Sequence, residues 1–219
     1  MSKDIRDTGE TGHSGRISRR AEYAEATRRA VIDEARRLFS EKGYFATKVD
    51  DVASAARVSP ATVYVIGGKQ GLLRILVDQW SAAPEIETTR RRLEGLDDAA
   101  EIMRVVSGLT RQMREDYGDI MRVVLATAPH DPTAAEGLAI ATHRYRDGTA
   151  VAARRLAELG ALRDGVDADE ALDILWFYFG YAGFFTLVDD NGWSHARAER
   201  WLLDAACRAL LRPVGGHDA

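Results

Sequence analysis

Apolar residues in the first third of the chain recur every three or four positions, which is the spacing of an amphipathic helix. The clearest stretch runs from about Ala24 to Lys42, and Gly43 follows it where helices commonly end on glycine. A first helix is therefore predicted over residues 24–42. The side chains on its apolar face are Val31, Ala35, Leu38 and Phe39.

A second helix is predicted after a short loop. Thr47 stands three residues before Asp50, which is the spacing of a capping box, in which a hydroxyl and a carboxylate each accept a hydrogen bond from the other residue's backbone amide. The helix should run from about Lys48 to Ala56. Because Ala53 and Ala56 are small, another helix can cross this one closely.

The third and fourth helices are marked by a cap and by paired glycines. Ser59 is a favourable N-cap, and Pro60 suits the first helical position, where its missing amide hydrogen costs nothing. The third helix should extend to about Ile66, where Gly67 and Gly68 end it. A fourth helix, from Lys69 to about Ala82, would carry the apolar residues Leu72, Leu73, Leu76 and Trp80.

Beyond Pro84 the pattern changes to longer helices. Runs of alternating apolar and polar residues, which would indicate strands, are hard to find, and only five prolines interrupt the 219 residues. We therefore predict an all-α fold with a tail over 1–22, a helix-turn-helix domain over 23–70 and a larger helical domain over 71–219. The later helices are predicted at 85–94, 98–116, 118–128, 132–159, 167–189 and 194–211.

The net charge of −4 is unevenly distributed along the chain. Residues 1–70 hold 13 Lys/Arg against 10 Asp/Glu, a net +3, and the remainder holds 17 against 24, a net −7. This division favours an N-terminal unit that faces phosphate. The polar N-terminus is predicted to be a disordered tail, and its basic cluster is either a solvated terminus or an arm that contacts DNA. The cluster consists of Arg16, Arg19 and Arg20.

Other classes of protein find little support in the composition. The only cysteine, Cys207, excludes an internal disulfide, and no histidine cluster, phosphate-binding loop or nucleophile beside a base is visible, so we expect no metal, no cofactor and no catalytic residue. The N-terminus lacks the apolar segment of a signal peptide. The apolar run from Ile174 to Val188 is 15 residues long, too short to span a bilayer, and predicts a core helix of a cytoplasmic protein.

The stretch RRAVIDEARRLFSEKGYFATKVDDVASAARVSPATVYVIGGKQGLL, residues 28–73, resembles the DNA-binding domain of the TetR family of bacterial transcriptional regulators. The resemblance rests on LF, KGY and Thr47, then on VDDVASAA and VSPATVY, and on a lysine followed by LL. It implies a homodimer whose third helices enter the major groove and whose C-terminal domains dimerise and enclose a small-molecule pocket. Beyond residue 84 the resemblance is one of architecture only.

Two features depart from the family pattern. The loop between Tyr64 and Lys69 is one residue short and lacks the usual aromatic residue. Arg57 takes a turn position where the family favours glycine, and a left-handed backbone there would cost about 1 kcal/mol or more. Both departures concern the angle at which the third helix meets DNA.

The predicted recognition helix has no Arg, Asn or Gln that could form a bidentate bond with a base edge, so methyl and ring contacts, hydroxyls and DNA shape must provide specificity. By resemblance, Thr47, Tyr64 and Lys69 would contact phosphate, and Lys48 lies at a helix N-terminus. Each has an alternative: Thr47 as a cap, Tyr64 as a packing residue and Lys69 as an exposed charge. The predicted DNA-binding residues are Thr47, Lys48, Pro60, Ala61, Thr62, Tyr64, Val65 and Lys69.

The C-terminal domain offers candidates for two further surfaces. The segment WFYFGYAGFF, residues 176–185, could form a four-helix dimer interface with the last helix, or an ordinary core. The predicted interface residues are Phe177, Gly180, Phe184, Trp201 and Ala205. The predicted ligand-binding residues, each more often a core residue than a pocket residue, are Trp80, Tyr117, His143 and Trp176.

The sequence therefore predicts a dimeric regulator, most simply a repressor, which binds a palindromic double-stranded DNA operator and is released by a small, mostly apolar effector. Two alternatives remain open. One is an all-α small-molecule carrier or enzyme without a role on DNA, and the other is a regulator without an effector.

Overall fold

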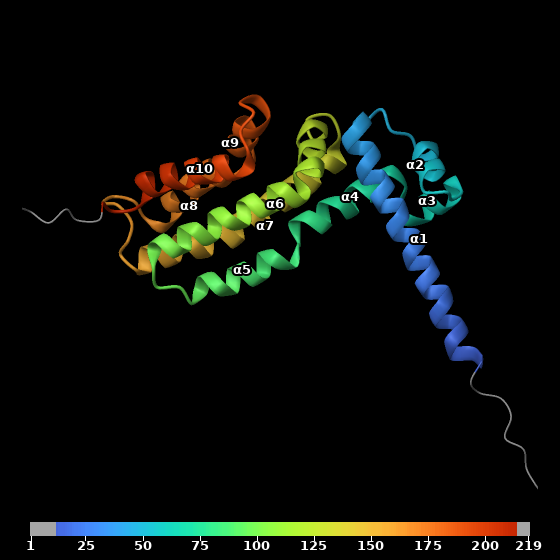
Figure 1. Cartoon of the computed structure of the whole chain (residues 1–219), viewed down its shortest axis with the longest axis horizontal. Helices are drawn as coiled ribbons and strands as arrows, with labels where there is room; N and C mark the ends of the chain where they lie inside the picture. The colour runs from blue at the N-terminus through green and yellow to red at the C-terminus, as the bar shows by residue number, and fades with distance from the viewer. Residues whose placement is uncertain (1–11, 214–219) are drawn as a thin grey trace, which may run out of the picture. The chain divides into compact units, whose positions relative to one another are not determined.

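The computed structural model describes residues 12–213, and these fold into helices joined by short turns (Figure 1). Over that range the only β-type pairing is an isolated bridge between Leu162 and Leu211. The prediction of an all-α fold is thus confirmed. The chain divides into two compact units, residues 1–76 and 77–219, and the division lies inside the fourth helix rather than at its start.

The first unit is a small helical domain around one apolar core. The core is built from Phe39, Val52, Val63 and Leu73, each at most 2% exposed. Phe39 also packs edge-on against the ring of Tyr44, with centroids 5.2 Å apart. The helices are α1 (Gly12–Lys42), α2 (Val49–Ala55), α3 (Pro60–Ile66) and α4 (Gly68–Ser81), and α4 continues into the second unit.

Helix α1 begins far earlier than the sequence pattern predicted. Residues 12–22, which were expected to belong to a disordered tail, form the first turns of α1, and residues 1–11 lie outside the described range. Alanine, arginine and glutamate are frequent between residues 19 and 30, and these residues have high helix propensity. A helix once formed over 24–42 is therefore extended at little cost.

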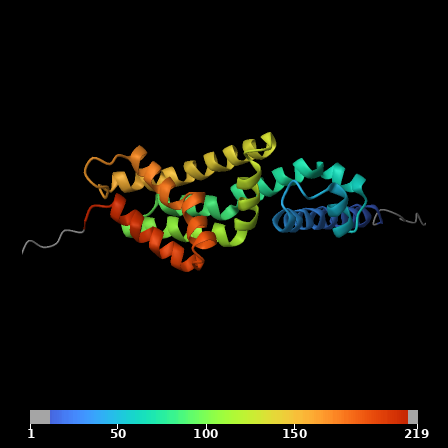
Figure 2. The same ribbon diagram turned by 90° about the horizontal axis from the view of Figure 1, so that it is seen from above.

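The second unit is a helical bundle in which α6 and α7 lie side by side (Figures 1 and 2). Helix α5 packs against both, and α8 and α10 cover a further face. The core includes Met103, Leu156, Leu175 and Phe184, each at most 1% exposed. The helices are α5 (Pro84–Glu94), α6 (Ala99–Thr127), α7 (Pro132–Glu158), α8 (Ala168–Phe179), α9 (Tyr181–Phe185), η1 (Thr186–Asp190) and α10 (His195–Leu210).

The prediction of two helices over 98–116 and 118–128 was wrong, because α6 runs unbroken through Gly118. A Cβ atom at this glycine would lie 2.8 Å from a terminal nitrogen of Arg122 and 3.7 Å from the ring of Phe185. The glycine therefore serves the close packing of neighbouring side chains and does not end the helix.

The predicted single helix over 167–189 is instead interrupted. At Gly180 the backbone turns extended, and a Cβ there would lie 2.4 Å from the carbonyl oxygen of Trp176, so only glycine fits. Helix α8 ends, and the short α9 and the π-helical turn η1 follow. Residues 168–190 have the length of a membrane span and contain an 18-residue window with a mean hydropathy of 1.5, but this break and their packing into the bundle make them a core segment of the second unit.

Candidate DNA-binding surface and interior cavity

The turn between α2 and α3 is closed by two backbone hydrogen bonds. The amide of Val58 donates to the carbonyl of Ala53 over 2.9 Å, and the amide of Arg57 donates to that of Ser54 over 3.2 Å. This pair of bonds requires a left-handed residue after the helix. Arg57 takes that conformation, with φ of 56°, and is the one non-glycine residue of the described range with positive φ. The left-handed backbone considered from the sequence is therefore present.

Replacing Arg57 with glycine should stabilise the α2–α3 turn by about 0.5–1 kcal/mol, because a side chain in the left-handed region costs about 1–2 kcal/mol and glycine's greater flexibility offsets only part of the gain. Hydrogen exchange of the α2 and α3 amides would report the change. The control is Arg57→Ala, which removes the same guanidinium and keeps the strain. Equal protection in the two variants would show that the strain is negligible.

Helix α3 has the bounds predicted from the sequence, Pro60–Ile66. The Ser59 hydroxyl accepts a hydrogen bond from the amide of Thr62 over 3.3 Å and caps the helix. Val63 is fully buried, so the helix is fixed to the core through this side chain. On the opposite side Tyr64 is 66% and Val65 is 87% exposed. Pro60 and Ala61 are also exposed and Thr62 is half-buried, so the predicted contact face is available.

Helix α3 ends abruptly at the shortened loop. Gly67 has φ of 123°, and a Cβ there would lie 3.0 Å from the Cα of Gly71 in α4. The close approach of Gly67 and Gly71 thus allows α3 and α4 to be separated by a single residue, Gly67. This close approach explains how a loop shorter than the family pattern is accommodated without disturbing the cap or the buried Val63.

The structure places the Thr47 side chain away from the surface. It is 1% exposed, and its hydroxyl lies 2.9 Å from the carbonyl oxygen of Gly43 and 3.2 Å from that of Leu38. The predicted phosphate contact by this side chain is therefore wrong, because both acceptors lie inside the unit. The N-cap of α2 is Lys48, whose amide donates to the Asp51 carboxylate over 3.0 Å, one residue later than predicted. The Lys48 side chain is exposed.

Lys69 has a structural role that the sequence did not reveal. Its ammonium lies 3.1 Å from the carbonyl oxygen of Thr47 and 3.5 Å from that of Phe45, and 4.3 Å from the centroid of the Tyr44 ring. The side chain therefore ties the start of α4 to the loop between α1 and α2. A phosphate contact by the same ammonium stays a prediction.

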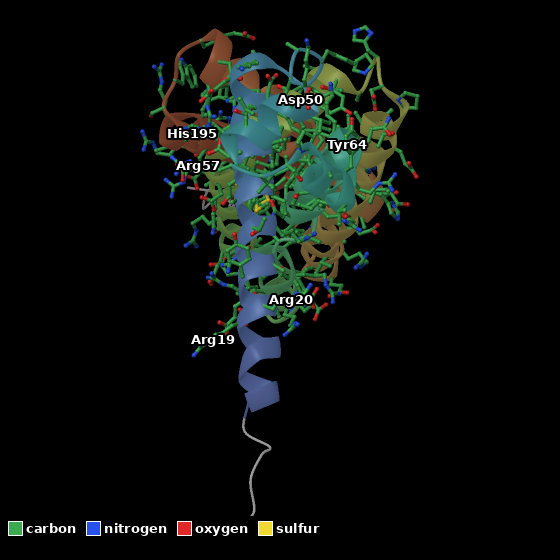
Figure 3. All side chains as sticks on the ribbon, turned by 90° about the vertical axis from the view of Figure 1, so that its right-hand side faces the viewer. Arg19, Arg20, Asp50, Arg57, Tyr64 and His195 are labelled. Atoms are coloured by element: carbon green, nitrogen blue, oxygen red, sulfur yellow. The ribbon has the colours of Figure 1, made fainter. Side chains whose placement is uncertain are left out.

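A basic groove that sequence reasoning missed lies beside α3. Arg20 and Arg28 of α1 line it together with Arg57 of the turn and with Thr62 and Val65 of α3. All three arginines are exposed. Figure 3 shows Arg19 and Arg20 on the N-terminal part of α1, and Arg57 and Tyr64 on the part that holds α2 and α3. The groove was missed because α1 was predicted to begin at residue 24. Arg20 was therefore assigned to a flexible tail, whereas it belongs to the helix.

The second unit contains a cavity of about 40 Å³ between α4, α5, α6 and α7. Of the four predicted ligand-binding residues only Trp80 lines it. Tyr117 is half-buried elsewhere, and the His143 side chain is 78% exposed and lies 3.3 Å from Asp147 on the surface. Trp176 lies behind Tyr145, with ring centroids 5.5 Å apart. Sequence reasoning missed the polar residues that line the cavity, which include Thr110, Arg114, Tyr145 and Thr149.

An open apolar groove of about 880 Å³ lies over α8, α9 and α10. Three of the five predicted dimer residues line it, namely Phe177, Gly180 and Trp201, and Phe177 is 74% exposed. Ala205 is half-buried and lies outside the lining. Phe184 is 1% exposed inside the bundle core, so its side chain is not available at the surface.

Comparison with known proteins agrees with this arrangement. Residues 31–74 match the family model described as bacterial regulatory proteins, tetR family. The HTH-type transcriptional regulator YdeS of Bacillus subtilis (strain 168) is 24% identical over 159 residues, which cover 69% of this chain and 75% of YdeS.

Two solved structures show the same fold over most of the chain. The TetR family transcriptional regulator PfmR of Thermus thermophilus has a TM-score of 0.63 at 22% identity, covering 85% of this chain and 96% of PfmR. SmeT, the repressor of the Stenotrophomonas maltophilia multidrug efflux pump SmeDEF, has a TM-score of 0.66 at 20% identity, covering 87% of this chain and 93% of SmeT. SmeT is also known in complex with triclosan. The helix-turn-helix geometry and the match over residues 31–74 show that the first unit carries a DNA-binding domain of the kind found in bacterial regulatory proteins of the tetR family, and the chain as a whole shares the fold of the two solved structures.

Proposed function

We propose that the protein is a cytoplasmic, dimeric repressor that binds a palindromic operator and is released by a small-molecule effector. The observation that carries the proposal is the exposed face of α3, with Tyr64 and Val65 flanked by the basic groove. Two such helices, one from each protomer, would occupy successive major grooves about 34 Å apart.

The contacts available to α3 determine how it would read DNA. Val65 and Ala61 offer methyl groups for thymine methyls, and the hydroxyls of Thr62 and Tyr64 can hydrogen bond to a base edge or to a phosphate. The arginines of the groove would fix the register through phosphates, which carry no base code. Sequence preference would then depend strongly on the shape of the DNA.

Helix α4 provides a route from effector to DNA. Its first residues pack in the DNA-binding unit, and its residue Trp80 lines the cavity of the second unit. An effector that displaces the Trp80 ring would shift α4 and favour a conformation in which the two α3 helices no longer match the operator. The triclosan complex of SmeT supports a small-molecule effector for a protein of this fold.

Binding of the purified protein to its upstream intergenic DNA, measured by fluorescence anisotropy over a range of salt, tests the DNA-binding role. Arg28→Ala should reduce the slope of log affinity against log salt by about 0.9, the value for one lost phosphate contact. The control is Arg29→Ala, since Arg29 is 69% exposed, pairs with Glu25 and does not line the basic groove.

Tyr64→Ala in the same assay should weaken operator binding more than binding to unrelated DNA, because the Tyr64 side chain belongs to the reading face. If Arg28→Ala and Arg29→Ala have equal salt slopes, the basic groove does not contact DNA phosphate. A wild type with no preference for any fragment in a selection of bound genomic DNA would contradict the proposed function itself.

A further inference from the structure

Arg114 of α6 is a buried charge without a charged partner. The side chain is 2% exposed, and it forms no ion pair with a carboxylate of residues 19–213. Its Nη2 donates to the carbonyl oxygen of Phe179 over 3.2 Å, and its Nη1 lies 3.5 Å from the sulfur of Met121. Its Nε atom has no hydrogen-bond partner. An arginine of this kind is unusual, because buried charges are normally paired.

Arg122, two turns later in α6, has the carboxylate partner that an arginine side chain normally has. Its guanidinium forms two parallel hydrogen bonds of 2.6 Å with the Asp189 carboxylate. Arg114 has instead one neutral carbonyl, one sulfur atom and the faces of the Tyr181 and Phe185 rings, 5.1 and 5.6 Å from its Cζ. Burial lowers the pKa of the Arg114 guanidinium, yet arginine stays protonated at neutral pH. Arg114 is therefore a guanidinium that no carboxylate of the described residues pairs with.

Arg114 is one of the residues that line the 40 Å³ cavity. Close to it the Tyr145 hydroxyl donates to the same Phe179 carbonyl over 2.9 Å and lies 3.2 Å from the Thr110 hydroxyl. Burial raises the pKa of Tyr145, so its hydroxyl keeps its proton and can donate. The rest of the lining is mostly apolar, with Ile86, Leu93, Val106, Leu109 and Met113, and it also includes Ser81, Thr89 and Arg90.

We propose that Arg114 and Tyr145 bind the carboxylate of an effector whose apolar body lies against α5 and the first half of α6. This inference rests on the proposed effector-controlled repressor and names the chemical class of its ligand. The Phe179 carbonyl now accepts from both side chains, and a carboxylate oxygen would replace it as a stronger acceptor. A cationic ligand is disfavoured, because no anionic side chain lines the cavity to compensate Arg114.

The alternative role for Arg114 is structural. Phe179 is the last residue of α8, and a cation at a helix C-terminus stabilises the helix through its unpaired carbonyls. The two roles predict opposite effects when Arg114 is replaced by methionine. Loss of a structural cap lowers the melting temperature, whereas replacement of an uncompensated buried charge by an apolar side chain leaves it unchanged or raises it.

The test uses the full chain without DNA and two pairs of probes, octanoate with octanamide and phenylacetate with phenylacetamide. Titration calorimetry should show that wild type binds at least one of the anions and binds its amide about 30-fold more weakly or worse. Arg114→Met should lose at least about 30-fold in affinity for that anion. The control is Arg111→Met, one turn earlier in α6, where the lost arginine lies outside the cavity lining and pairs with the half-buried Glu199, and its affinity should equal that of wild type.

Three results would overturn the proposal: no binding of either anion, equal binding of acid and amide, or a melting temperature of Arg114→Met several degrees below that of wild type. Failure of the proposed function is recognised separately, since operator binding by wild type is measured without any probe. If wild type binds octanoate but no operator, the proposed carboxylate site is supported and the proposed repressor function is contradicted.

Discussion

If the protein is the proposed dimer, Phe177→Arg should convert it into a monomer of 24.1 kDa and weaken binding to the proposed operator by about 100-fold or more. The Phe177 ring is 74% exposed in the apolar groove, so its replacement removes no contact with the protomer core. In the proposed dimer a twofold interface would bring the same groove of both protomers together, so the variant dimer would bury two unpaired charges, one from each protomer. Light scattering after size-exclusion chromatography measures the mass, and anisotropy measures the affinity.

The matched control for this prediction is Ile140→Arg. Ile140 is an exposed apolar residue of α7, 43% exposed, and it lies outside the groove. Ile140→Arg should leave both the mass of the protein in solution and its affinity for the operator unchanged. A Phe177→Arg protein that stays dimeric would locate the dimer interface on another face, and the groove over α8 to α10 would then lose its proposed role.

Phe39→Ala should destabilise the DNA-binding unit by about 3–5 kcal/mol, the usual cost of deleting a fully buried phenyl ring and leaving a cavity. The ring is 0% exposed and packs against Tyr44, and the first unit is small, so few other contacts offset the loss. Hydrogen exchange resolved by mass spectrometry should show lost protection in α1, α2 and α3, with operator binding reduced in parallel.

Phe45→Ala provides the comparison, because this phenylalanine of the same unit is 57% exposed. It should cost less than about 1 kcal/mol. Protection in α7 and α10, which belong to the second unit, should not change in either variant. A loss of protection spread evenly over both units in Phe39→Ala would mean that they unfold together and that the stability of the first unit cannot be varied independently.

The DNA-binding unit was largely predictable because its signals are local. Ser59 and Pro60 mark the start of α3, and Gly67 marks its end, so the helix has the bounds that the sequence indicated. The later helices were less predictable, since a glycine can break a helix or allow close packing. Gly118 allows packing and Gly180 breaks the helix, and the difference lies in contacts with residues distant in sequence.

The functional residues divide in the same way. The exposed positions of α3 follow from helical periodicity around the buried Val63. The basic groove requires Arg20 and Arg28 to lie beside α3, which depends on tertiary structure. Arg114 could not be identified as buried from its pattern, because an arginine in an amphipathic helix is normally assigned to solvent. His143 was proposed as a pocket residue for its chemistry, but its helical position faces outward.

Under the proposed control by an effector, the small size of the cavity would limit the speed of the response. A space of about 40 Å³ holds only a few water molecules, so an organic effector could bind only after side chains and helices had moved apart. Binding would then wait for an open state that is rarely populated, and its rate would level off as effector concentration rises. The delay between the arrival of an effector and the release of DNA would be set by the motions of the bundle, even when effector is abundant.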